Sequence, residues 1–162
     1  MKQLIHKTTH DCDLSFKYPH GSIRFGEENY SGIPLIMHSN GTVCWEATDY
    51  ILYRINRNLS LAKSTLITYA RHLSRSIAFI DKYQLSLSDL TDYHIFDLVK
   101  YLQDPKYSNT GKPADNNQVN AILAALFNML IFLQSTGRVP KKLISTDLKI
   151  PGQLNIVPLK YT

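Results

Sequence analysis

The sequence predicts a mainly α fold, a four-helix domain preceded by short β-strands. Apolar residues recur at a helical period of about 3.6 from residue 46 onward, whereas the first 43 residues alternate with a strand-like period. Capping residues and glycine or proline breaks divide the helical part into four segments. The 162 residues, 44% hydrophobic and 19% charged, have the composition of a folded protein.

Residues 1–43 are predicted to form an N-terminal arm of short strands and irregular chain. Segments 14–18 and 22–25 can pair across Pro19, His20 and Gly21, and segments 33–37 and 42–44 flank Asn40 and Gly41. Asn-Gly is a strong hairpin signal. We expect little order before residue 14.

The first two helices follow this arm. The first is expected from about residue 46 to residue 56, with a buried face of Ala47, Ile51, Leu52 and Ile55. The second is expected from about residue 61 to residue 83, with a buried face of Leu66, Tyr69, Ala70, Leu73, Ile77 and Ile80.

Two further helices are marked by their caps. The third should begin after Thr91 as N-cap and bury Ile95, Leu98, Val99 and Leu102. Residues 104–115 contain Pro105, Gly111 and Pro113 and are predicted to form a loop. The fourth helix should begin after Asp115 and stop at Gly137, and bury Val119, Ile122, Leu123, Leu126, Leu130 and Leu133.

Bulk composition permits a polyanionic partner, because the net charge is +5. The two cysteines, Cys12 and Cys44, form no Cys-x-x-Cys pair, which argues against a disulfide scaffold and fits a reducing cytoplasm. No signal peptide is evident, and the apolar run of residues 121–133 is too short to span a bilayer. A cytoplasmic protein without membrane partners is therefore expected.

No catalytic, cofactor or metal site is predicted. The histidines and cysteine near the N-terminus (His6, His10, Cys12 and His20) have no second ligand pair at zinc-finger spacing. The chain also contains no glycine-rich phosphate loop, nucleophile elbow or paired-carboxylate arrangement.

The helical part resembles the core-binding domain of tyrosine recombinases, the phage-integrase family. Residues 64–73, in which Thr65 and Tyr69 lie four residues apart, are similar to the opening of a long helix in that domain. Residues 90–102 and 117–133, the latter ended by Gly137, resemble its next two helices. Upstream, residues 33–36, Asn40-Gly41 and residues 50–52 resemble its lead-in strand and first helix, so the resemblance covers roughly residues 33–140.

The resemblance implies a SAM-like helical domain that grips double-stranded DNA at a recombination site, with other recombinase protomers as partners on the DNA. In that family a larger catalytic domain joins this domain to close a C-shaped clamp on the DNA. The catalytic domain supplies arginines, a His-x-x-Arg element and a nucleophilic tyrosine. The only His-x-x-Arg of this sequence, His72 to Arg75, lies inside the predicted second helix, and the 25 residues that follow Gly137 are too few for a domain of that kind. We therefore expect an N-terminal arm (1–43), a core-binding domain (44–137) and a linker toward an absent catalytic domain (138–162), without catalysis by this fragment.

The second helix carries the first set of candidate DNA contacts. Its basic and hydroxylated residues fall opposite the apolar face: Lys63, Ser64, Thr68, Arg71, Arg75 and Lys82. Lys and Arg neutralise phosphates and release counterions, and short hydroxyls donate to phosphate oxygens. The alternative is an ordinary solvated outer face.

The fourth helix carries a line of small and amide residues: Asn117, Asn120, Ala124 and Asn128, with Gln118 beside it. Asn can form two hydrogen bonds with an adenine edge in the major groove. Many members of the recombinase family carry arginines just after the asparagine of this helix, where Ala121 and Ile122 stand here. Alternatively, Asn117 and Asn120 support the helix start and Asn128 lies at a helix contact. The DNA-binding interpretation requires the outward sides of the second and fourth helices to lie together.

The loop of residues 106–112 supplies Lys106 and Lys112 and leads into the fourth helix, whose first amides favour an anion. It could clasp a phosphate or be a plain surface loop.

A helical protein–protein interaction module is the alternative function. Phe127, Ile131 and Phe132 cannot all share the core face of the fourth helix. They could pack on the first helix, on the N-terminal strands or on a neighbouring protomer.

Overall fold

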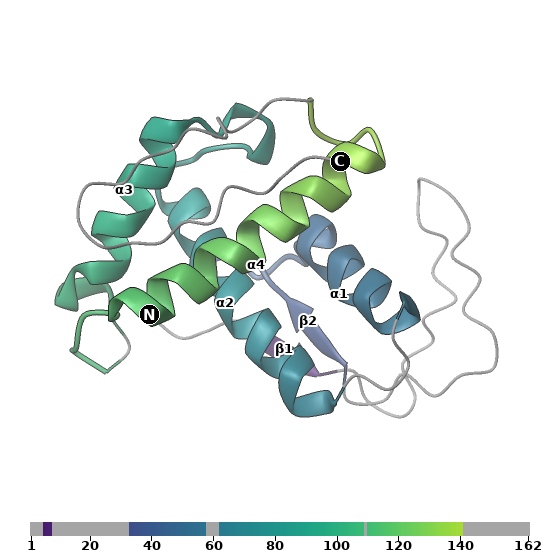
Figure 1. Cartoon of the computed structure of the whole chain (residues 1–162), viewed down its shortest axis with the longest axis horizontal. Coiled ribbons are helices and arrows are strands. Elements are labelled where there is room, and N and C mark those ends of the chain that lie inside the picture. The colour runs from purple at the N-terminus through teal and green to yellow at the C-terminus, as the bar shows by residue number, and fades with distance from the viewer. Residues whose placement is uncertain (1–4, 8–32, 58–61, 109, 141–162) are drawn as a thin grey trace.

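The computed structural model describes residues 5–7, 33–57, 62–108 and 110–140 (Figure 1). This part of the chain is mainly α-helical, as predicted. Its helices are α1 (Trp45–Arg57), α2 (Lys63–Lys82), α3 (Asp92–Gln103) and α4 (Asn116–Ser135). Two short strands, β1 (Ile5–Lys7) and β2 (Pro34–Ile36), and two 3-10 turns, η1 (Leu87–Asp89) and η2 (Pro105–Tyr107), complete the described elements.

Local capping sets the predicted helix ends. Thr91 precedes α3, and its backbone N–H donates to Nδ1 of His94 at 3.1 Å. Asp115 precedes α4, and its Oδ1 accepts from the backbone N–H of Gln118 at 2.8 Å. Gly137 has φ of 72° directly after the C-cap of α4, a conformation that glycine adopts without strain.

The strands differ in part from the prediction. β1 pairs antiparallel with β2, with Ile5 opposite Ile36, so the expectation of little order before residue 14 is wrong for residues 5–7. The turn at Asn40-Gly41 is confirmed: Met37 bridges Val43, and Gly41 has φ of 87°. The predicted pairing of segments 14–18 and 22–25 lies outside the described residues.

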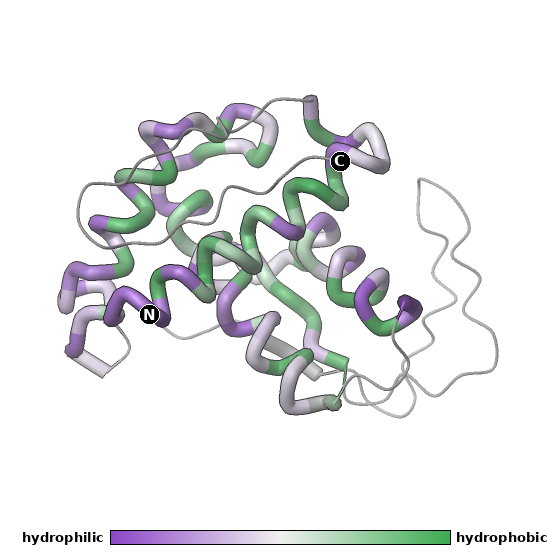
Figure 2. The backbone as a smooth tube through the Cα atoms, viewed as in Figure 1, coloured by the Kyte–Doolittle hydropathy of each residue, from purple (hydrophilic) through white to green (hydrophobic). Residues whose placement is uncertain are grey.

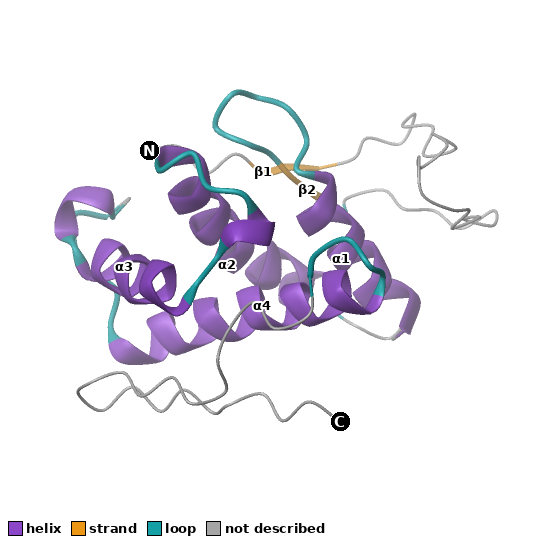
Figure 3. Cartoon of the chain, turned by 90° about the horizontal axis from the view of Figure 1, so that it is seen from above, coloured by secondary structure: helices purple, strands orange, loops and turns teal. Residues whose placement is uncertain are grey.

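The core lies between α4 and the other elements. In Figure 3, α4 lies on one side of α2 and the β1–β2 pair on the other, with α1 and α3 flanking α2. Hydrophobic residues follow α4 along much of its length (Figure 2). All predicted core positions of α3 and α4 are buried, and on α1 and α2 only Ile55 and Tyr69 are partly exposed. Ile33 and Ile36 from the β2 region join the same core.

The α4 aromatics pack within the chain. Phe127 and Phe132 are buried, and the Phe132 ring lies 5.9 Å from that of Tyr50 and 4.7 Å from that of Tyr53, both on α1. Ile131 is partly exposed. Of the three sites that the sequence left open for these side chains, α1 receives Phe132.

The predicted apolar run of residues 121–133 is part of a longer helix. Among the described helices, α4 alone is long and apolar enough to cross a membrane by length and composition. Core helices share that property, and most of the apolar side chains of α4 are buried against other elements.

A partly buried ion pair joins the segment after α4 to α1. The Arg138 guanidinium donates to Oδ2 of Asp49, whose side chain is 2% exposed. The backbone N–H of Arg138 also donates to the Leu133 carbonyl at 2.9 Å. The segment after α4 is therefore held against the first helix.

Replacing the α4 N-cap tests how much this local signal contributes. Asp115→Ala removes the acceptor for the Gln118 amide and is expected to lower the free energy of unfolding by about 1 kcal/mol. Urea denaturation followed by circular dichroism measures the change. Asn117→Ala, at an exposed position in the same turn, is the matched control and should have a clearly smaller effect. Equal losses in both variants would contradict a capping role.

Candidate nucleic-acid interface

The outward side of α2 presents the predicted polar residues as one stripe. Ser64, Thr68 and Arg71 are exposed, and Arg75 and Lys82 continue the same face at helical spacing. The Thr68 hydroxyl donates to the Ser64 carbonyl at 3.0 Å, so it is engaged by its own helix. Lys63 is the first residue of α2, but its side chain lies outside the described part.

Arg75 is a half-buried member of this face. Burial lowers its pKa, and the nearby Tyr101 on α3 acts in the opposite direction. Arg75 also helps to lower the pKa of His72, although burial is the larger cause there. Arg75 therefore lies between its own helix and α3 and has a packing role in addition to its charge.

Lys82 connects the end of α2 to the loop before α4. Its Nζ lies 3.4 Å from the centre of the Tyr107 ring in η2 and 5.4 Å from that of Tyr101. The Tyr101 and Tyr107 rings stack at 4.6 Å, and Lys106 Nζ lies 5.7 Å from the Tyr107 ring. A hydrogen bond with Tyr107 is the main cause that raises the pKa of Lys82.

These contacts join two predicted groups of residues into one basic surface. The α2 cations continue through Lys82 to Lys106 of the predicted loop. We call this surface the basic stripe and define it as Arg71, Arg75, Lys82 and Lys106. The sequence indicated all four cations, but it contained no signal that Tyr101 and Tyr107 would gather around Lys82, because the three residues belong to separate segments.

A cleft of about 550 Å³ opens beside the stripe. Tyrosines form part of its wall, and Asp97 and Asp104 lie in its lining. The Asp97 carboxylate lies 3.4 Å from Lys100 Nζ, and Asp104 accepts from the Lys106 backbone N–H at 2.9 Å. The cleft carries charges of both signs, so the exposed stripe is the better place for a polyanion.

The amides of α4 are less accessible than the sequence suggested. Asn117 is exposed, whereas Asn120 and Asn128 are partly buried. Oδ1 of Asn120 is buried and has no hydrogen-bond partner within the described part of the chain. Gln118 takes part in the α4 capping box. A continuous amide line for reading bases is therefore not presented.

The outward sides of α2 and α4 do not merge into the single surface that the sequence required. α4 packs on one side of α2, and β2 packs on another (Figure 3). The exposed residues of α2 point to neither partner. The exposed residues of α4, such as Ala124, lie opposite the buried face of that helix, which holds Ile122 and Leu126. Phosphate contact and base reading would thus use separate surfaces.

The loop before α4 is present, but its predicted anion site is already used. Lys106 and Lys112 are exposed, and the Ala114 N–H donates to the Leu102 carbonyl at 3.1 Å, which ties the loop to α3. At the first turn of α4 the Asp115 carboxylate occupies the position where an anion would bind. A phosphate there would compete with this side chain.

Comparison with known proteins identifies no relative of this chain. No family model, curated protein or solved structure matches the chain. The arrangement of its own side chains is therefore what bears on function.

Burial of Phe127 predicts a folding defect rather than a binding defect. Phe127→Asp places a carboxylate in the core and should lower the free energy of unfolding by about 3 kcal/mol or more. Ile131→Asp, at a partly exposed site on the same helix, should cost much less. Chemical denaturation and gel filtration distinguish the alternatives. A stable Phe127→Asp protein that loses self-association would instead indicate a docking surface on α4.

The lowered pKa of His72 predicts a pH-dependent stability. The group has an ordinary pKa of 6.5, and in the folded chain burial, assisted by Arg75, lowers it. As pH falls below 6.5, the unfolded chain takes up a proton at this site before the folded chain does, so folding stability is lost. Urea midpoints between roughly pH 7.5 and pH 5 should fall less in His72→Gln than in the wild type. If the urea midpoints of the wild type and of His72→Gln fall equally with pH, groups other than His72 cause the loss of stability.

Proposed function

We propose that this chain is a DNA-binding module of the kind found in tyrosine recombinases, which performs no catalysis itself and holds duplex DNA through α2 and the loop before α4. The interpretation of the sequence also required the outward side of α4 to lie beside that of α2; because these two sides are separate, α4 is not part of the proposed interface. The observation that carries the proposal is the basic stripe, in which cations on the outer face of α2 and Lys106 of a separate loop are linked through the ring of Tyr107. In this role the phosphate backbone is the ligand of the stripe.

The dimensions of the stripe suit a DNA backbone. From Arg71 to Lys82 the helix rises roughly 16 Å at 1.5 Å per residue. Phosphates along one strand advance by about 3.4 Å of helix axis per nucleotide. Several phosphates can therefore lie within reach of α2, and Lys106 extends the contact beyond the helix end.

Tyrosine packing pre-organises the far end of the stripe. Lys82 lies over the Tyr107 ring, and the Tyr101 ring stacks against that of Tyr107. A lysine held in this way loses less side-chain entropy when it meets a phosphate. The Lys82 side chain is also exposed, so its charge is accessible to a phosphate.

The recombinase assignment is the finer part of the proposal. It is supported by the order of the helices and by the residues that carry the resemblance. Residues 64–73 open the long α2, residues 90–102 lead through α3, and residues 117–133 lie within α4. In such a protein this SAM-like, core-binding part would hold DNA while a separate catalytic domain cleaves it, and neighbouring protomers would bind alongside.

Alanine variants of the stripe test the proposal through the salt dependence of binding. The probe is a random-sequence duplex of about 30 base pairs, titrated by fluorescence anisotropy between roughly 50 and 200 mM salt. Arg71→Ala and Lys106→Ala should each reduce the slope of log K against log salt by about 0.9, and the double variant by about twice that. Arg57→Ala, at an exposed cation near the end of α1, is the matched control and should leave the slope unchanged.

Two outcomes would contradict the proposal. One is a folded wild-type chain that does not bind the duplex at low salt. The other is a slope that Arg57→Ala lowers as much as Arg71→Ala does, because binding would then follow net charge and not the stripe.

A further inference from the structure

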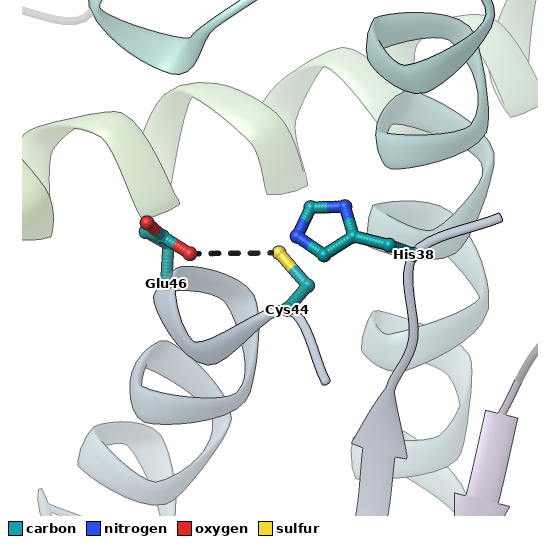
Figure 4. Close-up of side chains that lie close together, drawn as sticks. All are labelled: His38, Cys44 and Glu46. Atoms are coloured by element: carbon teal, nitrogen blue, oxygen red, sulfur yellow. Dashed lines mark hydrogen bonds between the residues drawn. The ribbon is translucent and has the colours of Figure 1, made fainter. Parts of the chain in front are cut away.

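Three side chains with metal-binding atoms meet beside the first turn of α1. His38 lies in the turn after β2, Cys44 directly precedes α1, and Glu46 is in its first turn (Figure 4). Each offers one ligand atom, and these atoms all lie within 4.8 Å of one another. Cys44 is buried, while His38 and Glu46 are partly exposed. The cluster was not predicted from the sequence.

We propose that His38, Cys44 and Glu46 form a Zn²⁺ site with three protein ligands and a fourth position for water. Imidazole nitrogen, thiolate sulfur and carboxylate oxygen are the three ligand types that Zn²⁺ takes in proteins. A three-ligand set leaves a fourth tetrahedral position open to solvent, and the partial exposure of His38 and Glu46 lets water reach it.

The spacing of the ligand atoms is close to what Zn²⁺ needs. A tetrahedral ion with ordinary bond lengths holds sulfur and oxygen ligands about 3.6 Å apart. Cys44 Sγ and Glu46 Oε2 are 3.9 Å apart. The widest pair of ligand atoms is within 4.8 Å, so closing it to this distance requires a shift of roughly 1 Å, which is within the range of small side-chain rotations.

A second carboxylate orients the histidine for this role. Nδ1 of His38 lies 2.8 Å from Oδ1 of Asp81, near the end of α2. The other carboxylate oxygen of Asp81 accepts from the Ser39 backbone N–H at 2.6 Å, so the carboxylate itself is held in place. This leaves Nε2 of His38 as the ring nitrogen for a metal, and in Figure 4 a ring nitrogen faces the Cys44 sulfur. Metal-binding histidines commonly donate their second N–H to a carboxylate in this way.

The backbone around the cluster is also well anchored. The Cys44 N–H donates to the Ile36 carbonyl at 2.8 Å, and the His38 N–H donates to the Thr42 carbonyl at 2.8 Å. The turn that carries His38 is therefore held against the start of α1 before any metal binds. A Zn²⁺ ion would lock this turn, α1 and, through Asp81, α2 together.

Cobalt substitution of the full chain tests the site directly. The purified protein should contain about one Zn²⁺ per chain by elemental analysis, and Co²⁺ added to the metal-free chain should produce a thiolate-to-metal absorption band. Trp45, the single tryptophan, lies between Cys44 and Glu46 in sequence, so bound Co²⁺ should quench its fluorescence. Cys44→Ser should abolish the band, and Asp81→Asn should weaken binding 10- to 100-fold, about the usual loss for such an orienting partner.

Control variants separate this cluster from other ligands. Cys12→Ser and His10→Ala alter the N-terminal histidines and cysteine and should leave the band and the quenching unchanged. His38→Ala and Glu46→Gln keep the buried thiol in place and should still weaken binding if Cys44→Ser proves unstable. The proposal is overturned if Cys12→Ser removes the band, or if millimolar Co²⁺ produces no band in the folded wild type. In that case the contacts are an ordinary His38–Asp81 pair and a thiol–carboxylate contact.

Discussion

Burial of α4 against α1, α2 and α3 is the interaction on which the rest of the structure depends. Ten of its twenty residues are buried, and fully burying a Leu, Ile, Met or Phe side chain stabilises the fold by about 1.5–3 kcal/mol each. The other helices take their positions from this contact. Only five residues of α4 are exposed, and the proposed binding surface is therefore on α2 and the loop at its far end.

The last turn of α2 is where the two proposed sites meet. Asp81 points to the turn that carries His38, whereas the next residue, Lys82, lies over the Tyr107 ring. Neighbouring residues on a helix point about 100° apart, so one turn can serve both surfaces. Metal binding at the proposed Zn²⁺ site would hold the helix end that presents Lys82, and would in this way connect that site to the proposed DNA contact.

Much of the candidate surface could be predicted because it lies on one helix. Thr68, Arg71 and Arg75 follow the helical period, and their outward position needs only the apolar residues opposite them. The role of Lys82 as a link could not be predicted, because it depends on Tyr107, which η1 and α3 separate from α2 in the chain. The same holds for His38 and Asp81, which are 43 residues apart. Asn120 shows the limit of spacing along one helix: it lies on the predicted line of amides on α4, but its amide oxygen is buried.

The sequence by itself determined the mainly α class, the ends of the helices and most of the core, because caps, glycines and apolar period act through neighbours a few residues away. Asp115 and Gly137 bound α4 for that reason. The tertiary structure alone decided that β1 pairs with β2, that Phe132 packs on α1 and that His38, Cys44 and Glu46 meet. These contacts depend on how packed elements face one another in space, and side-chain period along one segment carries no information about the direction of its partner.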